Sequence, residues 1–208
     1  DLQQGQGRGL WKSDGTEAGT NMVKDINHHS HNLTDVNGTL FFVADNGTHG
    51  RELWKSDGTE AGTVMVKDID PTEFDHPKFL TNVNGILYFV AKGGGLWKSD
   101  GTEEGTVLVK PYVPNSYSWP GYLTNVNGTL YFVLNDGNEY GVLWKIDGTG
   151  NAVKVPGQDS SKYRHKSLVN VNGTLYFVAD QHHLSYMPPG AELWKIDETG
   201  TAVRIPEI

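Results

Sequence analysis

Residues 123–134 read LTNVNGTLYFVL, and residues 143–155 read LWKIDGTGNAVKV. The first stretch opens with a short apolar run that ends at Asn127-Gly128, a dipeptide typical of a tight β-hairpin turn. The apolar run Leu130–Leu134 follows at once and is unbroken, as expected for a strand with both faces buried. In the second stretch, Asp147-Gly148 separates two further apolar runs. Together the stretches predict four short strands joined by tight turns.

The same pattern recurs along the whole chain. The tripeptide Leu-Trp-Lys occurs five times, at spacings of 43, 43, 47 and 50 residues, and Val-Asn-Gly occurs four times, at spacings of 47, 43 and 45. Five of the six tryptophans are repeat markers: Trp11, Trp54, Trp97, Trp144 and Trp194. A repeat of four antiparallel strands in about 46 residues is typical of a β-propeller blade. We therefore predict an all-β propeller, without substantial helix because no helical period persists.

Composition excludes several classes of protein. The 208 residues carry 17 Lys and Arg against 25 Asp and Glu, a net charge of −8, which argues against binding nucleic acid or an anionic membrane. Cysteine is absent, which excludes disulfides, Cys-ligated metals and a thiol nucleophile, and fits an exported protein. No apolar run approaches the 18 residues that a membrane span requires. The chain begins at Asp1 without an initiator Met, so we expect a processed chain or a piece of a longer one.

The stretch ELWKSDGTEAGT at residues 52–63 and its copy GLWKSDGTEEGT at residues 95–106 resemble the ELWxxDGT repeat family. The last two copies depart from the pattern, because Ile146 and Ile196 replace the serine and the turns shorten to DGTGNA and DETGTA. The resemblance covers nearly the whole chain and implies a secreted or surface-exposed, mostly bacterial repeat protein. It implies no catalytic residue. Unit length and strand order also resemble the five-bladed lectin propellers of the tachylectin type, which implies sugar binding.

The repeat predicts one propeller domain over residues 1–208, of the five-bladed type. Residues 1–32 would form an N-terminal half-blade with only its third and fourth strands. Four complete blades would follow, at residues 33–79, 80–122, 123–167 and 168–208. The missing hairpin of the first blade could come from a longer parent chain or from a second chain, or the ring could keep an open edge. Self-association through the incomplete blade is therefore one expectation.

The connections between strands divide into two groups, one at each end of the blades. The turn between the first and second strands is always Val-Asn-Gly, and the turn between the third and fourth always keeps an Asp. The other connections differ in every copy, as NHHSHN at residues 27–32 and DQHHLSYMPPGAE at residues 180–192 illustrate. We call the first group the fixed end and the second the varied end. Variable loops on a rigid scaffold are where binding sites are usually built, so the varied end is the candidate binding surface.

Aromatic and basic side chains gather in the varied loops. All eight histidines fall there, and we expect none in the strands. Counting back four residues from the leucine expected to open each first strand gives His29, His76, Trp119 and Arg164, which would stand at equivalent places around the mouth of the ring. Such side chains suit stacking on a sugar or holding a carboxylate. The full set of predicted ligand-binding residues is His29, His76, Trp119, Arg164, Tyr117, Tyr163, His165, His183 and Tyr186.

Each of these features also has a purely structural interpretation. Histidines are common in surface loops, although convergence of His29, His76 and His165 would instead suit copper or zinc. The repeated tryptophans each follow a leucine expected to be buried, so packing between blades explains them better than ligand contact. The repeated lysines could pair with acidic residues of neighbouring turns. The Asp of each Asp-Gly-Thr turn has too few carboxylates around it for calcium and is expected to cap its own turn.

The sequence contains no nucleophile elbow, no P-loop and no HExxH motif, so we predict a protein that is not an enzyme and has no cofactor. We expect a non-catalytic extracellular or cell-surface module that binds a ligand, with a glycan as the favoured ligand. One alternative is a structural or adhesive surface repeat that binds another protein. A second alternative is a metal-dependent hydrolase at the propeller mouth.

Overall fold

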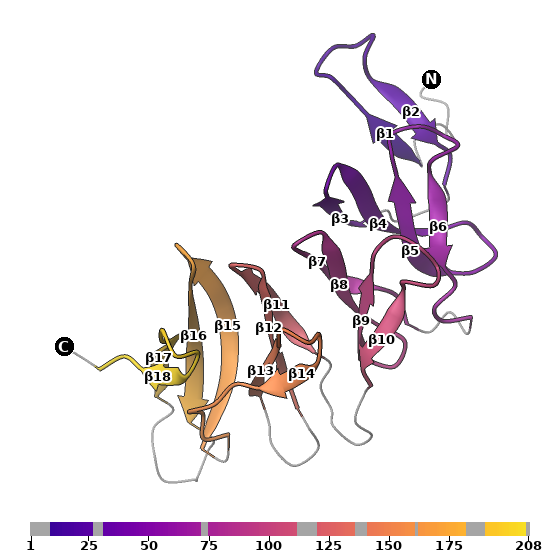
Figure 1. The fold of residues 1–208 in the computed structure, drawn as a ribbon. Coiled ribbons are helices and arrows are strands. Elements are labelled where there is room, and N and C mark those ends of the chain that lie inside the picture. Colours follow the sequence, from indigo (N-terminus) through magenta and orange to yellow (C-terminus); the bar gives the residue numbers. More distant parts are fainter. Residues whose placement is uncertain are drawn as a thin grey trace. The chain divides into compact units, whose positions relative to one another are not determined.

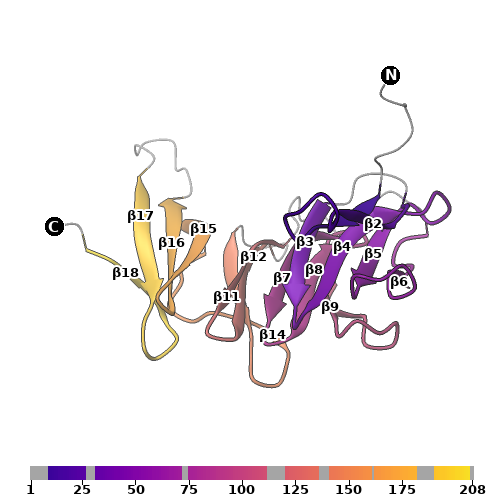
Figure 2. The same ribbon diagram turned by 90° about the horizontal axis from the view of Figure 1, so that it is seen from above.

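The computed structural model describes residues 9–26, 31–71, 75–111, 120–135, 141–160, 162–181 and 190–206. These residues form eighteen strands and no helix. The strands make one two-stranded sheet and four four-stranded antiparallel sheets, and within each sheet neighbours in the chain are neighbours in space (Figure 1; Figure 2 shows the same strands from above). The prediction of an all-β protein built from repeated four-stranded sheets is confirmed.

The sheets follow one another along the chain. The first sheet contains β1 (Leu10–Lys12) and β2 (Asn21–Lys24). The second contains β3 (His31–Val36), β4 (Thr39–Asp45), β5 (Arg51–Ser56) and β6 (Val64–Lys67). The third contains β7 (Lys78–Val83), β8 (Ile86–Ala91), β9 (Gly95–Ser99) and β10 (Val107–Lys110). The fourth contains β11 (Gly121–Val126), β12 (Thr129–Leu134), β13 (Val142–Ile146) and β14 (Ala152–Lys154). The fifth contains β15 (Tyr163–Val171), β16 (Thr174–Gln181), β17 (Ala191–Ile196) and β18 (Ala202–Arg204).

The second strands of the second, third and fourth sheets are buried on both faces, as their unbroken apolar runs predicted, whereas β16 of the fifth sheet buries Leu175, Phe177 and Ala179 on one face and leaves the other half-buried. On β4, Phe42 packs with Leu10 and Val23 of the first sheet. Its chain neighbour Phe41 points the other way and packs with Leu87 of the third sheet. Alternation of side chains along a strand therefore lets one short strand serve two cores.

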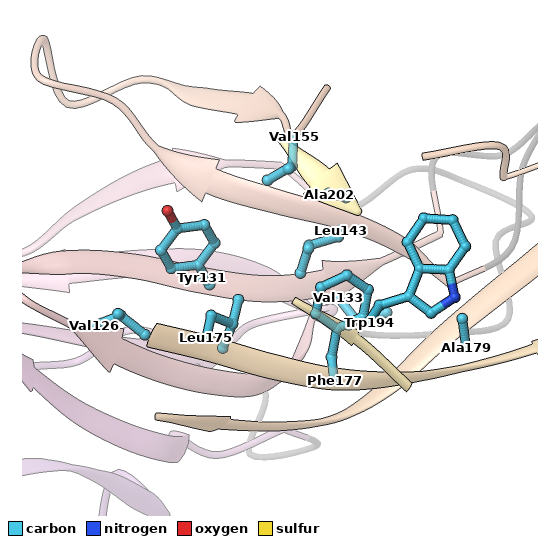
Figure 3. Packing of buried hydrophobic residues seen from close by; sticks show 10 residues of the cluster. All are labelled: Val126, Tyr131, Val133, Leu143, Val155, Leu175, Phe177, Ala179, Trp194 and Ala202. Atoms are coloured by element: carbon cyan, nitrogen blue, oxygen red, sulfur yellow. The ribbon is translucent and has the colours of Figure 1, made fainter. Parts of the chain in front are cut away.

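The Leu-Trp pair on each third strand also faces two ways. Trp54 of β5 packs with Leu10 and Ile26 of the preceding sheet, whereas Leu53 packs with Phe89 of the following sheet. The same division holds in the fourth and fifth sheets, where Leu143 and Trp194 meet in one cluster (Figure 3). Packing between sheets therefore accounts for Trp54 and Trp194, whereas Trp11 of the first sheet is exposed.

The first strands contain a repeated irregularity that the sequence pattern did not predict. In β3, β7, β11 and β15 the register with the second strand shifts just before the apolar part of the strand. A residue with positive φ lies at each shift, and these residues are Asn32, Phe79, Tyr122 and Ser167. The strands therefore begin before the leucines expected to open them. The expectation that strands contain no histidine is wrong, because His31 opens β3 and His165 lies in β15.

The chain divides into two compact units, residues 1–93 with 97–107 and residues 94–96 with 108–208. The first unit holds the two cores between the first, second and third sheets. The second unit holds the core between the fourth and fifth sheets. Closure of these sheets into a single five-bladed ring over residues 1–208 stays a prediction.

Candidate ligand-binding site

The turns between the third and fourth strands of the first three sheets are locked by their own side chains. In the second sheet, Oδ1 of Asp57 accepts hydrogen bonds from the backbone N–H and the hydroxyl of Thr59, at 2.8 and 2.7 Å. Asp14 and Asp100 do the same in their turns. These bonds, the Thr59 hydroxyl first, hold the pKa of Asp57 below its usual value. The prediction that this aspartate caps its own turn is confirmed.

Two glycines of this long turn are required for different reasons. Gly58 has a φ of +87°, a conformation that side chains with a Cβ rarely adopt. Gly62 lies against the capping carboxylate, since a Cβ there would be 2.1 Å from Oδ1 of Asp57. A bond of 2.7 Å between the hydroxyls of Ser56 and Thr63 closes the base of the turn. The motif SDGTEAGT is therefore explained by the turn alone.

The last two sheets use a shorter turn with the same capping residue. Oδ1 of Asp147 accepts from the N–H and hydroxyl of Thr149, at 2.9 and 2.7 Å, and from the N–H of Asn151 at 3.0 Å. Ile146 replaces the serine and is buried. Asp197 makes the same set of bonds in the fifth sheet.

The repeated lysines of the first and second sheets each join their sheet to the next one. Lys12 Nζ donates to the carbonyl oxygen of Gly58 at 2.9 Å, and Lys55 Nζ donates to that of Gly101 at 2.8 Å. These acceptors are main-chain atoms, not the acidic side chains that the sequence suggested. The pKa of Asp100 is lowered mainly by the N–H and hydroxyl of Thr102, and the charge of Lys55 adds to the shift.

Asparagine side chains of the first strands hold the other turn of the fixed end, which joins the first and second strands. Oδ1 of Asn82 accepts from the N–H of Gly85 at 3.0 Å, and its Nδ2 donates to the carbonyl of Asp35 in the preceding sheet at 2.9 Å. Asn170 does the same between the fifth and fourth sheets. The repeated polar groups at the fixed end are thus engaged in holding turns and joining sheets.

At the varied end, His76 is the first predicted site residue that the structure describes. Its backbone N–H donates to Oδ1 of Asp75 at 3.1 Å, and the same carboxylate oxygen pairs with Lys78 Nζ at 3.0 Å. The side chain of His76 is half-buried. Five other predicted site residues lie outside the described residues, namely His29, Trp119, Tyr117, His183 and Tyr186.

Three predicted loop residues lie on a strand instead. Tyr163, Arg164 and His165 begin β15, which is longer than the other first strands, so their assignment to a loop is corrected. The strand extends because its hairpin with β16 keeps pairing as far as Tyr163. Arg164 is exposed, whereas Tyr163 is half-buried with its ring edge-on to Trp194, 5.2 Å between centroids.

His165 is part of the core of the second unit. The residue is 2% exposed, and its ring meets those of Phe177 and Trp194 edge-on. Nδ1 lies 2.7 Å from the carbonyl oxygen of Gly141, so the proton sits on Nδ1. Burial lowers the pKa of His165, and the bond to Gly141 opposes this only in part. The imidazole is therefore neutral and held in place.

Glu52 is a buried acid that the sequence did not single out. The residue is 1% exposed, and its two carboxylate oxygens accept from the N–H groups of Ile69 and Asp70, at 3.1 and 3.0 Å. Burial raises the pKa of Glu52 to about 7. In the fourth sheet Gln158 has a similar role, bonding both the N–H and the carbonyl of Leu143. Two different residue types at different positions hold the same connection, and only Glu52 belongs to the repeated motif, with Glu192 at its place in the fifth sheet.

A cavity of about 220 Å³ opens at the varied end of the first unit. Lys24, Asp25 and Ile26 line it from the first sheet, and Asn46 and Trp54 from the second. Asp25 is exposed, while Asn46 holds its own loop by accepting from the N–H groups of Thr48 and His49. Lys24 Nζ donates to the carbonyl oxygens of Glu60 and Thr63, at 3.3 and 2.8 Å, so Asp25 supplies the exposed charged group of this cavity. None of these five residues was among the predicted site residues, because the cavity arises only when two sheets pack together.

The described residues show neither a metal site nor a membrane-spanning helix. Among them, no three His, Asp or Glu side chains are grouped so that they could hold a metal ion. The same part of the chain contains no helix long and apolar enough to cross a bilayer.

Comparison with solved structures gives a clear likeness in fold. A crystal structure of a puromycin hydrolase mutant complexed with PGG aligns with a TM-score of 0.55 and 17% identity over 90% of this chain. The likeness shows a propeller-like fold. This chain spans only 30% of that protein.

Other comparisons give lower scores or no match. The tricorn protease aligns with a TM-score of 0.37 and 16% identity, covering 95% of this chain and 18% of that one. A protein of unknown function from Bacteroides thetaiotaomicron aligns with a TM-score of 0.42 and 14% identity, covering 89% and 49%. A scan against protein-family models finds no match, and a search of curated proteins finds no relative.

Proposed function

We propose that this protein is a non-catalytic extracellular module that binds a glycan at the varied end of its sheets. The observation that carries the proposal is the cavity beside Trp54. Asp25 supplies an exposed carboxylate that can bond to sugar hydroxyls, and the small exposed part of Trp54 gives the cavity an apolar edge against which a sugar ring can pack. In the first unit, the repeated Asp, Lys and Asn side chains of the fixed end already hold turns and join sheets, so there the varied end is the surface that we expect to bind the ligand.

Membership of the ELWxxDGT repeat family is part of this proposal. It rests on ELWKSDGTEAGT at residues 52–63 and on its copies. Such membership would place the protein at the cell surface or outside the cell. Protease treatment of intact producing cells tests the location, since a surface protein would be digested and an intracellular one protected.

A glycan array on the folded protein, run with calcium and with EDTA, tests the binding. We expect binding to a defined sugar. Asp25→Ala should lower the affinity about tenfold by removing one charged hydrogen-bond partner. Asp68→Ala is the matched control, because Asp68 holds the equivalent place in the next repeat and does not line the cavity. A blank array in both conditions, or equal loss in the two variants, would overturn the proposal.

A second candidate function is contact with another protein, and exposed apolar side chains favour it. Leu193 of the fifth sheet is 48% exposed, whereas its repeat equivalents Leu53, Leu96 and Leu143 are all fully buried. Trp11 of the first sheet is 48% exposed, against 6% for Trp54. The fifth sheet therefore exposes the face that in other sheets packs against a following sheet. The first sheet exposes the face that in other sheets packs against a preceding one.

Under this second proposal, the two faces bind each other between copies of the chain. The contact joins two different surfaces, so a lysine on either one should block it, and Leu193→Lys and Trp11→Lys should each be monomeric. A 1:1 mixture of the two variants still contains one intact copy of each surface. It should therefore form a dimer through that pair. Sedimentation velocity measures the outcome. Val171→Lys is the control. Val171 is exposed on the fifth sheet too, but it belongs to the first strand of that sheet, β15. The first sheet consists of β1 and β2 alone and has no strand that would cover β15, so this variant should still associate. A monomeric wild type, or a mixture that stays monomeric, would rule out self-association.

A further inference from the structure

The second unit contains a cavity at the fixed end of its sheets. Its volume is about 330 Å³, and it lies between the fourth and fifth sheets. Asn127, Thr129 and Tyr131 line it from the β11–β12 hairpin, Thr174 lines it from β16, and Glu198 lines it from the turn between β17 and β18. The volume lies within the range of small-ligand sites, about 300 to 1,000 Å³.

The short turn explains why the cavity lies here. In the first unit, the long turn of the third sheet brings Gly101 so close to the second sheet that a Cβ on it would be 3.1 Å from the ring of Phe41. Tyr131 is the repeat equivalent of Phe41, since each pairs with the lysine of its third strand. The facing turn of the fifth sheet, residues 196–202, is shorter and leaves the space open.

Tyr131 brings a hydroxyl to this space from a largely buried side chain. The residue is 8% exposed and belongs to the core cluster of Figure 3. Its hydroxyl makes no hydrogen bond among the described residues, and burial raises the pKa of the phenol. A tyrosine hydroxyl can both donate and accept a hydrogen bond. A ligand hydroxyl in the cavity would supply a partner for it.

The remaining lining groups indicate the chemistry of the ligand. The hydroxyls of Thr129 and Thr174 face no hydrogen-bond partner among the described residues, and both can donate and accept. Nδ2 of Asn127 is bonded to the carbonyl of Gly173 at 2.9 Å, which leaves its Oδ1 as an acceptor. Glu198 is exposed at the rim with Asp197 beside it, and Nζ of Lys145 lies 3.4 Å from where a Cβ on the lining residue Gly200 would stand, so these three groups leave a net negative charge at the entrance. Hydroxyl and amide groups inside an acidic rim favour a neutral, hydroxyl-rich molecule over an anionic one.

We propose that this cavity is a second binding site, specific for a neutral sugar. The inference rests on the proposed glycan-binding function and adds to it a site at the opposite end of the sheets, together with a preference against anionic sugars. The hydroxyl of Tyr131 would bond to a sugar hydroxyl, and Thr129 and Thr174 would bond to its neighbours on the ring.

The test uses methyl glycosides of glucose, galactose, mannose and N-acetylglucosamine, with methyl glucuronide as the anionic probe. Backbone amide shifts in NMR spectra of the full chain locate the binding. We expect at least one neutral glycoside to shift the amides of Thr129 and Thr174, and the glucuronide to leave them in place. Tyr131→Phe removes only the hydroxyl and should weaken that binding about tenfold.

Tyr88→Phe is the matched control. Tyr88 holds the same place in the third sheet, with the same exposure and a similarly raised pKa, but does not line the cavity. Equal affinities in the two variants, or no shift at Thr129 and Thr174 with any neutral glycoside, would overturn this inference. Asp25→Ala separates it from the first site, since its effect should be confined to binding beside Trp54. If that variant lost all sugar binding, the proposed function would stand, but the second site would be refuted.

Discussion

Gly58 and Gly148 occupy the same place in two Asp-Gly-Thr triplets, yet their backbones differ. Gly58 lies in a long turn with φ at +87°, whereas Gly148 lies in a short turn, has no positive φ and has open space where a Cβ would project. The fifth sheet has Glu198 at this position. One residue type thus meets two different constraints, which depend on the length of the turn.

We predict that Gly58→Ala destabilises the protein by about 1 kcal/mol, because alanine is strained at positive φ. Gly148→Ala should be neutral or slightly stabilising. Urea denaturation of both variants measures the free energy of unfolding. If both cost the same, then the two turns do not differ as described.

Glu52 should make stability depend on pH. Its pKa of about 7 in the folded state lies above the ordinary value of 4.5, so between these values the folded protein holds a proton that the unfolded chain releases. Its contribution to stability is complete below pH 4.5 and is lost as the pH rises to about 7. The loss is at most about 3 kcal/mol, at 1.36 kcal/mol for each unit of pKa.

Glu52→Gln cannot ionise, so the difference in stability between wild type and variant isolates this group. We expect that difference to shift against the wild type between pH 4.5 and pH 8 in urea denaturation. A difference that stays constant over this range would show that Glu52 has an ordinary pKa.

His165 should act in the opposite direction. Its pKa is lowered in the folded protein, so as the pH falls below about 6.5 the unfolded chain takes up a proton that the folded protein refuses. Stability is therefore lost on acidification. His165→Phe keeps an aromatic ring beside Phe177 and Trp194, and we expect it to remove this loss between pH 7 and pH 5 in thermal unfolding. Unchanged acid sensitivity in the variant would contradict the prediction.

At the scale of elements, side-chain donors bonded to main-chain acceptors join neighbouring sheets, and Lys55 makes one such bond between the second and third sheets. Lys55→Met keeps the length of the side chain but loses the bond to the carbonyl of Gly101. We expect a loss of about 1 kcal/mol in the free energy of unfolding, and a rise in the pKa of Asp100 toward its usual value, visible by NMR titration.

Lys195→Met is the control for this joint. Lys195 is the equivalent residue of the fifth sheet, and among the described residues no acceptor lies opposite it. The variant should change stability by less than about 0.5 kcal/mol. Equal effects at the two positions would mean that the bond to Gly101 contributes nothing.

At the scale of the whole molecule, the repeated features were predictable and the single ones were not. The turn at Asn127-Gly128, the buried run Leu130–Leu134 and the packing of Trp54 follow from local periodicity, which the sequence repeats several times. The register shifts at Phe79 and Tyr122 were missed because neither residue type favours a positive φ, so nothing local indicates them.

The candidate sites were less predictable than the sheets. The position of His165 depends on how far the β15–β16 hairpin extends, and loop composition does not encode that. The cavities beside Trp54 and Tyr131 form only where two sheets face each other. In the sequence, the residues of each wall therefore look like ordinary core or turn residues. The contrast between a fixed and a varied end was available from comparing the repeats with one another.

The lysine joint also bears on how such a chain could have grown. Its acceptor is a peptide oxygen, which every amino acid possesses, so the bond itself requires no particular side chain in the receiving turn, whose own residues are needed only to hold its path. A newly duplicated unit would need no matching substitution in its neighbour in order to attach. Gene duplication and unequal crossing-over could therefore add or remove whole units in one step, while each unit's connecting segments diverge independently.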